Sequence, residues 1–69
     1  MDYKTLDELL KGRMFPVVAV NENNENVIVV SGVNKYMGEF YRVTTAQKNG
    51  WCRINTYYED GTCEEEYTK

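Results

Sequence analysis

The chain has 69 residues, a formal net charge of −3, 42% hydrophobic and 28% charged residues, and no histidine. This length predicts one domain, residues 1–69, which buries only about 60% of the surface that its unfolded form exposes. The composition argues against disorder. The longest apolar run, residues 14–20, is too short for a membrane span of about 20 residues, and the polar start of the chain is unlike a secretion signal. We therefore expect a cytoplasmic protein that does not bind a membrane.

The absence of histidine narrows the chemistry open to the chain. Histidine is the usual general base near neutral pH and the commonest metal ligand. Catalysis would have to rest on Asp, Glu, Tyr, Lys or Cys side chains alone. We therefore expect no enzymatic activity, no cofactor and no metal site.

The net charge is confined to residues 51–69. Residues 1–50 carry six basic and six acidic residues, whereas residues 51–69 carry two basic and five acidic residues. The same segment holds four of the nine aromatic residues: Trp51, Tyr57, Tyr58 and Tyr67. This combination of aromatic rings and carboxylates is the most specialised part of the sequence.

A short helix is predicted over residues 5–12. Thr5 and Glu8 have the spacing of a capping box, and Gly12 is a typical helix stop. An apolar stripe recurs at helical spacing: Leu6, Leu9 and Leu10. Because two helical turns are not stable alone in water, we expect the three leucines to cover a sheet.

Five strands are predicted after the helix, from runs of β-branched and aromatic residues separated by turn residues. They cover residues 15–20, 27–31, 36–45, 51–58 and 62–69. Residues 32–35 are a predicted turn, and Gly38 indicates a bulge. Asn49-Gly50 and Asp60-Gly61 are typical two-residue hairpin turns. The sequence therefore predicts an α+β fold in which one short N-terminal helix precedes a five-stranded antiparallel meander.

The first hairpin is apolar at every position of its two strands, Val17–Val20 and Val27–Val30. Such strands require cover on both faces, and one short helix covers only one of them. Two alternatives follow. Either the sheet curls into a small barrel, or a second copy of the chain packs against the Val17–Val30 hairpin as a homo-oligomer.

Two-residue turns would fix which side chains share a face of the last three strands. One face is predicted to be the core side beneath the helix: Tyr41, Val43, Thr45, Cys52, Ile54, Thr56, Tyr58, Cys63 and Tyr67. The other face is predicted to meet solvent: Arg42, Thr44, Ala46, Trp51, Arg53, Asn55, Tyr57, Glu64 and Glu66.

Neither the cysteines nor the acidic run is predicted to be catalytic. In this register Cys52 and Cys63 share a face but lie roughly 20 Å apart. A disulfide requires Cα atoms within about 7 Å, so both thiols are expected to stay reduced. Glu64 and Glu66 have the spacing of paired catalytic acids but lie on an open sheet. We interpret the acidic run as protection of a sheet edge against aggregation.

The candidate binding residues lie on the predicted solvent face: Arg42, Trp51, Arg53, Tyr57, Glu64 and Glu66. Trp, Tyr and Arg are enriched in binding hot spots. The alternative is a solvated face held by cross-strand pairs, with Arg42 and Glu64 flanking Tyr57. The leading hypothesis is a small acidic interaction protein, an inhibitor or adaptor, whose C-terminal hairpin docks a protein partner with a basic surface.

Two further hypotheses use the same residues. A homo-oligomer would bind a small, nucleotide-like ligand against Trp51, Tyr57 and the arginines. A small barrel would instead bind single-stranded nucleic acid by stacking bases on this platform. The negative charge disfavours the latter, because it repels phosphate and makes extended nucleic acid a poor partner.

Overall fold

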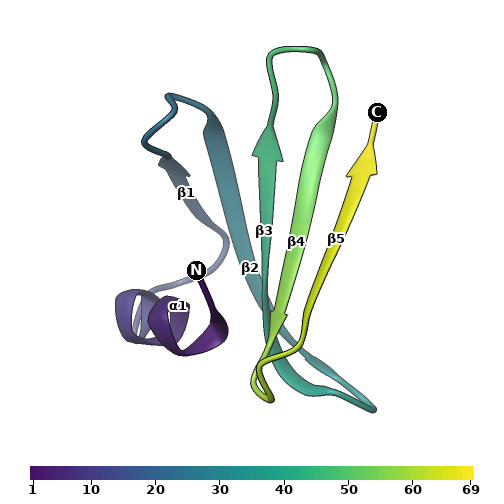
Figure 1. Cartoon of the computed structure of the whole chain (residues 1–69). Helices are drawn as coiled ribbons and strands as arrows, with labels where there is room; N and C mark the ends of the chain where they lie inside the picture. Colours follow the sequence, from purple (N-terminus) through teal and green to yellow (C-terminus); the bar gives the residue numbers. More distant parts are fainter.

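The fold is one helix and one open antiparallel sheet. The computed structural model describes residues 1–69 and contains α1 (Tyr3–Leu10), β1 (Val17–Val20), β2 (Asn26–Asn34), β3 (Gly38–Ala46), β4 (Cys52–Tyr58) and β5 (Cys63–Thr68). The strands lie side by side in chain order, β1-β2-β3-β4-β5 (Figure 1). The predicted α+β meander is therefore confirmed. The barrel alternative is wrong, because β1 pairs only with β2 and β5 only with β4.

The helix begins and ends two residues earlier than predicted. Asp2 is its N-cap, and the Asp2 carboxylate accepts a hydrogen bond from the Thr5 N–H at 2.9 Å. Asp is a strong N-cap residue, and its use replaces the predicted capping box of Thr5 with Glu8. With eight residues, α1 is too short to cross a membrane.

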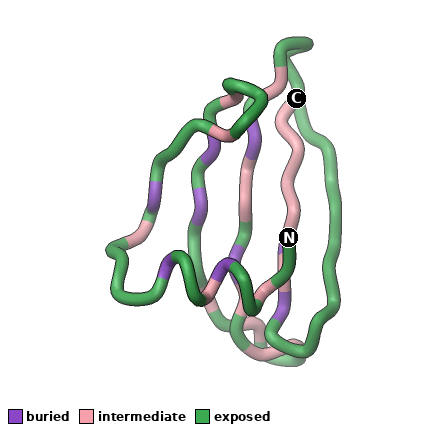
Figure 2. Tube along the Cα trace, turned by 60° about the vertical axis from the view of Figure 1, so that its left-hand side comes forward, coloured by how far each residue is buried: buried purple, intermediate pink, exposed green.

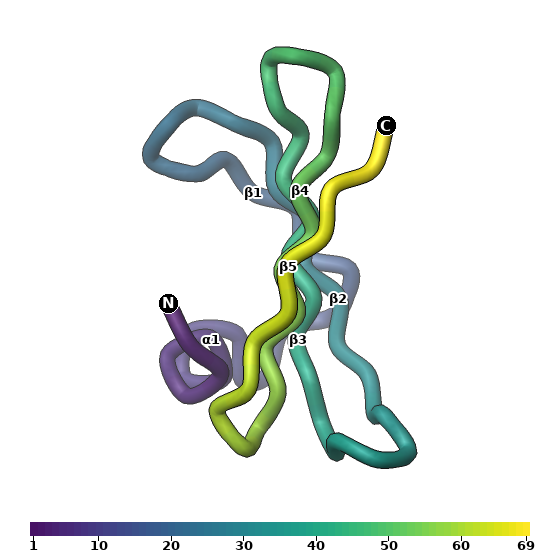
Figure 3. The backbone as a smooth tube through the Cα atoms, turned by 45° about the vertical axis from the view of Figure 1, so that its right-hand side comes forward, coloured from purple at the N-terminus to yellow at the C-terminus, as the bar shows by residue number.

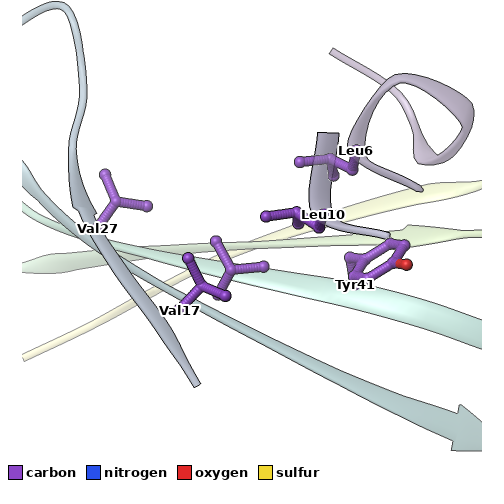
Figure 4. Packing of buried hydrophobic residues seen from close by; sticks show 6 residues of the cluster. Leu6, Leu10, Val17, Val27 and Tyr41 are labelled. Atoms are coloured by element: carbon purple, nitrogen blue, oxygen red, sulfur yellow. The ribbon is translucent and has the colours of Figure 1, made fainter. Parts of the chain in front are cut away.

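The core lies between α1 and the strands nearest to it. Figure 4 shows side chains from the helix and the sheet converging there, and the buried cluster consists of Leu6, Leu10, Val17, Val27, Val29 and Tyr41. The rings of Tyr3 and Phe15 pack against Tyr41, with centroids 5.1 and 5.8 Å from its ring. Two of the three helix leucines therefore cover the sheet as predicted, whereas Leu9 is 63% exposed.

The two faces of the sheet can be followed by residue parity. Every strand pair joins two odd-numbered or two even-numbered residues. We call the odd-numbered side the helix face, because its buried residues pack against Leu6 and Leu10. We call the even-numbered side the outer face. In Figure 3 the helix lies on one side of the twisted sheet, and no element covers the other side.

The hairpin between β3 and β4 has a three-residue turn, residues 48–50, where two residues are predicted. The Gln47 N–H donates to the Trp51 carbonyl at 2.9 Å, and the Gly50 N–H donates to the Gln47 carbonyl at 3.2 Å. Gly50 has a φ of 86°. A type I turn followed by a left-handed residue is the usual three-residue hairpin. Asn-Gly suits it because glycine adopts that conformation without steric cost.

The hairpin between β4 and β5 repeats this geometry in residues 59–61. The Tyr58 N–H donates to the Thr62 carbonyl at 2.9 Å, and the Gly61 N–H donates to the Tyr58 carbonyl at 3.0 Å. Gly61 has a φ of 92°. The prediction of a two-residue Asp60-Gly61 turn is therefore wrong, because the turn has three residues.

The longer turns shift the register by one residue at each of these hairpins. Val43 pairs with Asn55 where Thr56 is predicted, and Asn55 in turn pairs with Glu65. The first shift exchanges the two faces of β4 relative to the prediction. The second shift restores the side chains of β5 to their predicted faces. The predicted faces are therefore right for β3 and β5 and wrong for β4. The outer face, not the core, receives Cys52, Ile54, Thr56 and Tyr58. The helix face receives Arg53, Asn55 and Tyr57.

Strand β2 continues through the predicted turn at residues 32–35. Gly32 pairs with Phe40, whose ring lies over it, and a Cβ at Gly32 would be 2.7 Å from Phe40 Cζ. The turn follows at residues 35–37, where the Asn34 side-chain oxygen accepts hydrogen bonds from the Tyr36 and Met37 N–H groups at 2.8 and 2.9 Å. Gly38 is not a bulge and begins β3.

Candidate functional site

The six candidate binding residues do not share one surface. The outer face holds three of them: Arg42, Glu64 and Glu66. The helix face holds two, Arg53 and Tyr57. Trp51 lies between the turn and β4, is 39% exposed, and has the Lys69 ammonium 5.7 Å from its ring centroid. Because the two arginines lie on opposite faces, a ligand bound to one face does not contact both.

Arg42 is held within the outer face. Its Nε donates to Thr56 Oγ1 at 3.2 Å, and its guanidinium lies 5.0 Å from the centroid of the Phe40 ring. The Phe40 ring meets the Tyr58 ring edge to face at 5.9 Å. These contacts bury Thr56 and Tyr58. The predicted row of Arg42, Tyr57 and Glu64 is therefore corrected, because Thr56 lies between Arg42 and Glu64.

The carboxylates of β5 accept hydrogen bonds from neutral groups. The Tyr58 hydroxyl donates to Glu64, and this bond raises the pKa of Tyr58. On the helix face, Glu65 accepts from the Asn55 amide at 3.0 Å and from the Tyr67 hydroxyl at 3.5 Å. These donors carry no charge, so they leave the negative charge of the strand uncompensated.

Strand β5 is a free, exposed edge. All six of its residues are exposed, and Figure 2 shows this exposure along the whole strand. The hydrogen-bonded pair Tyr58–Thr62 fixes the alternation along the β4–β5 ladder. Hydrogen-bonded and non-hydrogen-bonded pairs alternate in an antiparallel ladder, so β5 points the backbone groups of three residues away from β4: Cys63, Glu65 and Tyr67.

Arg53 and Tyr57 line a cavity of about 280 Å³ on the helix face. Its walls come from α1 and from β1 to β4, and most of its lining is apolar. Strand β4 contributes Arg53, Asn55 and Tyr57 to its polar lining, beside Asn21 and Thr45. Burial raises the pKa of Tyr57. Two-residue turns would place these three residues of β4 on the solvent face, so the sequence does not predict that they line the cavity. A three-residue turn places the odd-numbered positions of β4 on the helix face, and this parity is the signal that could have found them.

A second cavity, of about 240 Å³, lies at the other end of the helix face. The Tyr41 hydroxyl donates to Asp7 at 2.7 Å, and the Tyr3 hydroxyl donates to Glu39 at 3.1 Å. The bond to Asp7 raises the pKa of Tyr41 to about 12, and burial raises the pKa of Tyr3 to about 12. No motif in the sequence indicates these pairs, which connect α1 to β3.

The two cysteines lie on opposite faces, Cys52 on the outer face and Cys63 on the helix face, so the prediction that they share a face is wrong. Both are free thiols. The structure contains no group of three or more Cys, Asp or Glu side chains arranged to hold a metal ion. Comparisons with known proteins found no matching family model, no matching curated protein and no matching solved structure.

Proposed function

We propose that the chain is a non-enzymatic interaction protein, an inhibitor or adaptor, that docks the basic surface of a protein partner along β5. The observation that carries the proposal is the free edge of β5, where all six residues are exposed. The proposed docking surface consists of Glu64, Glu65, Glu66 and Tyr67 of β5. Arg53 and Tyr57 are not included in it, because they lie on the helix face of β4.

The charge of β5 supports a basic partner. Its three glutamates lie at consecutive positions, so they project to both faces of the sheet. The hydrogen bonds that they accept come from neutral donors. Complementary charge steers a partner to such a surface and selects against acidic competitors.

The backbone of β5 supports docking by strand addition. The outward N–H and C=O groups of Cys63, Glu65 and Tyr67 have no strand beside them. An extended segment of a partner can pair with such an edge, with side-chain contacts supplying specificity. A second copy of β5 is a poor occupant, because its glutamates would face those of the first.

The experiment compares two charge-reversed variants with the wild type. Glu64→Lys with Glu66→Lys reverses the docking surface, and Glu8→Lys with Glu22→Lys makes the same change of charge at exposed positions elsewhere. Each protein is immobilised and exposed to lysate of its own host at low and at high salt. A protein retained by the wild type at low salt is purified, and its dissociation constant is measured.

We expect the retained protein to bind the Glu64→Lys, Glu66→Lys variant at least about tenfold more weakly than the wild type. The Glu8→Lys, Glu22→Lys variant keeps its affinity, and high salt weakens wild-type binding because it screens exposed charges. Equal affinity for the two variants, or retention that high salt does not weaken, would reject the proposal.

A further inference from the structure

The cavity on the helix face has the size and lining of a small-ligand site. Its volume is about 280 Å³. An apolar cavity of about 150 Å³ holds benzene, so this one has room for about two fused rings. Valines of β2 and β3 contribute to its apolar lining, Val27, Val29 and Val43, and Leu6 of α1 closes one side.

The polar side of the cavity offers a positive charge and unused hydrogen-bond donors to an anion. Arg53 is the only charged side chain among the lining residues. The side-chain hydrogen bonds of the chain use neither the Arg53 guanidinium nor the Tyr57 hydroxyl. A planar guanidinium with free N–H groups matches a carboxylate in two-pronged geometry. A ligand carboxylate would therefore find unused donors at one end of an apolar cavity.

The net negative charge of the chain repels an anion. This repulsion opposes the attraction between the anion and Arg53, and the two energies can be compared. The net charge is −3 and the radius of gyration is 11.9 Å. Without Arg53 itself the charges of the chain sum to −4, from −3 minus 1. By Coulomb's law, a carboxylate about 4 Å from Arg53 in a partly desolvated site is attracted about three times more strongly than these charges repel it at that radius through water. Salt weakens the distant repulsion further. Two carboxylates accept hydrogen bonds from lining residues of the cavity and oppose an anion there: Glu65 accepts from Asn55, and Glu25 accepts from Asn21.

We propose that this cavity binds a small aromatic carboxylate, with its rings on the valines and its carboxylate on Arg53. The site lies on the helix face, away from the Glu64 and Glu66 side chains, and adjoins the proposed docking surface at Glu65. Its ligand is a small molecule and not a protein partner, so it goes beyond the proposed function. It also differs from a ligand site that uses both arginines, because Arg42 lies on the outer face.

The test uses 2-naphthoate as the probe and 2-naphthylmethanol, which has the same rings without the charge, as its control. Both are titrated into the wild-type protein by calorimetry. We expect saturable one-to-one binding of 2-naphthoate, and binding of the alcohol at least about tenfold weaker, because the alcohol lacks the charge-assisted pair with Arg53. Absence of saturable binding of 2-naphthoate at millimolar concentration would overturn the proposal, as would equal affinity for the two probes.

Matched variants locate the bound probe. Arg53→Gln should weaken 2-naphthoate binding about tenfold, whereas Arg42→Gln, which removes the same charge from the outer face, should leave it within about twofold. Glu65→Gln should tighten binding, since it removes an opposing charge that is bonded to the lining residue Asn55. Ala19→Leu fills part of the cavity from the exposed edge strand β1 and should weaken binding without depending on Arg53. Equal losses in Arg53→Gln and Arg42→Gln would reject the site.

Discussion

At the scale of single residues, the tyrosines of the second cavity connect the helix to the sheet. The Tyr41 ring belongs to the buried core, and its hydroxyl reaches Asp7 of α1. Tyr3 makes the reverse connection, from α1 to Glu39 of β3. In both pairs the phenol is a donor to a carboxylate, so the neutral phenol is the form that the folded protein stabilises.

Replacing Tyr41 with Phe is expected to destabilise the protein by about 1.5 kcal/mol, the usual contribution of a hydrogen bond to a charged group. The ring and its packing stay, so the loss reports the bond to Asp7. Urea unfolding measures it, with Tyr36→Phe as the control, because Tyr36 is 86% exposed. Equal stability of the two variants would contradict a structural role for this bond.

The same tyrosines predict how stability changes at alkaline pH. The pKa of Tyr3 and of Tyr41 is raised from 10.0 to about 12 in the folded chain. A group whose pKa is raised by folding stabilises the protein fully below its unfolded pKa, and this stabilisation is lost as the pH rises through the folded pKa. Stability should therefore fall between about pH 10 and pH 12, and Tyr41→Phe should fall less steeply. Unfolding midpoints measured across this range would test the slope.

At the scale of elements, turn length decides which side chains share a face. The order and type of the elements follow from β-branched runs, turn residues and leucine spacing, and all six elements form where the sequence places them to within a few residues. The register does not follow, because Asn49-Gly50 fits a two-residue turn and the last two positions of a three-residue turn equally well. The apolar residues of β4 do not settle the choice, since Ile54 and Tyr58 lie on the outer face, where Tyr58 packs against Phe40.

A third hairpin shows the same preference for three-residue turns. Between β1 and β2, the Asn21 N–H donates to the Glu25 carbonyl at 3.0 Å, and Asn24 adopts a φ of 63°. Asparagine is one of the few residues other than glycine that adopts this conformation readily. The signal in the sequence is therefore Asn or Gly at the third turn position, and it becomes readable only when the hairpins are compared.

Gly61→Ala is expected to destabilise the protein by about 1 to 2 kcal/mol, the usual strain of an L-residue in the left-handed region. The added Cβ itself meets no atom within 4 Å, so conformation and not crowding causes the loss. Gly61→Asn should cost clearly less, because Asn tolerates this conformation. Urea unfolding of both variants would decide, and equal losses would contradict the three-residue turn.

At the scale of the whole molecule, the open sheet leaves apolar side chains of the first hairpin uncovered. On the outer face, Val18 is 70%, Val20 59% and Ile28 46% exposed. The sequence offers two ways to cover them, a barrel or a second copy, and the barrel does not form. Contiguous exposed apolar patches commonly mark interaction sites. A second copy packed on this hairpin therefore stays a prediction.

Self-association through this patch predicts a mass that rises toward twice that of the chain with increasing concentration. Ile28→Lys should return the protein to a monomer, because a charge at the centre of an apolar interface is left without a partner. Val33→Lys is the matched control, since Val33 is exposed on the helix face. Sedimentation velocity reports the mass, and a wild-type protein that remains monomeric at high concentration would rule out this interface.

Both proposed sites depend on the same arrangement of faces: β4 turns Arg53 and Tyr57 toward the helix, while β5 keeps Glu64 and Glu66 on the outer face. Nuclear Overhauser contacts between Hα protons of non-hydrogen-bonded pairs test this most directly, because such pairs bring the two Cα atoms within about 4.5 Å. The structure predicts these contacts: Arg42 with Thr56, Thr44 with Ile54, and Asn55 with Glu65. Contacts of Val43 with Thr56 and of Thr45 with Ile54 would instead indicate two-residue turns and would contradict the account.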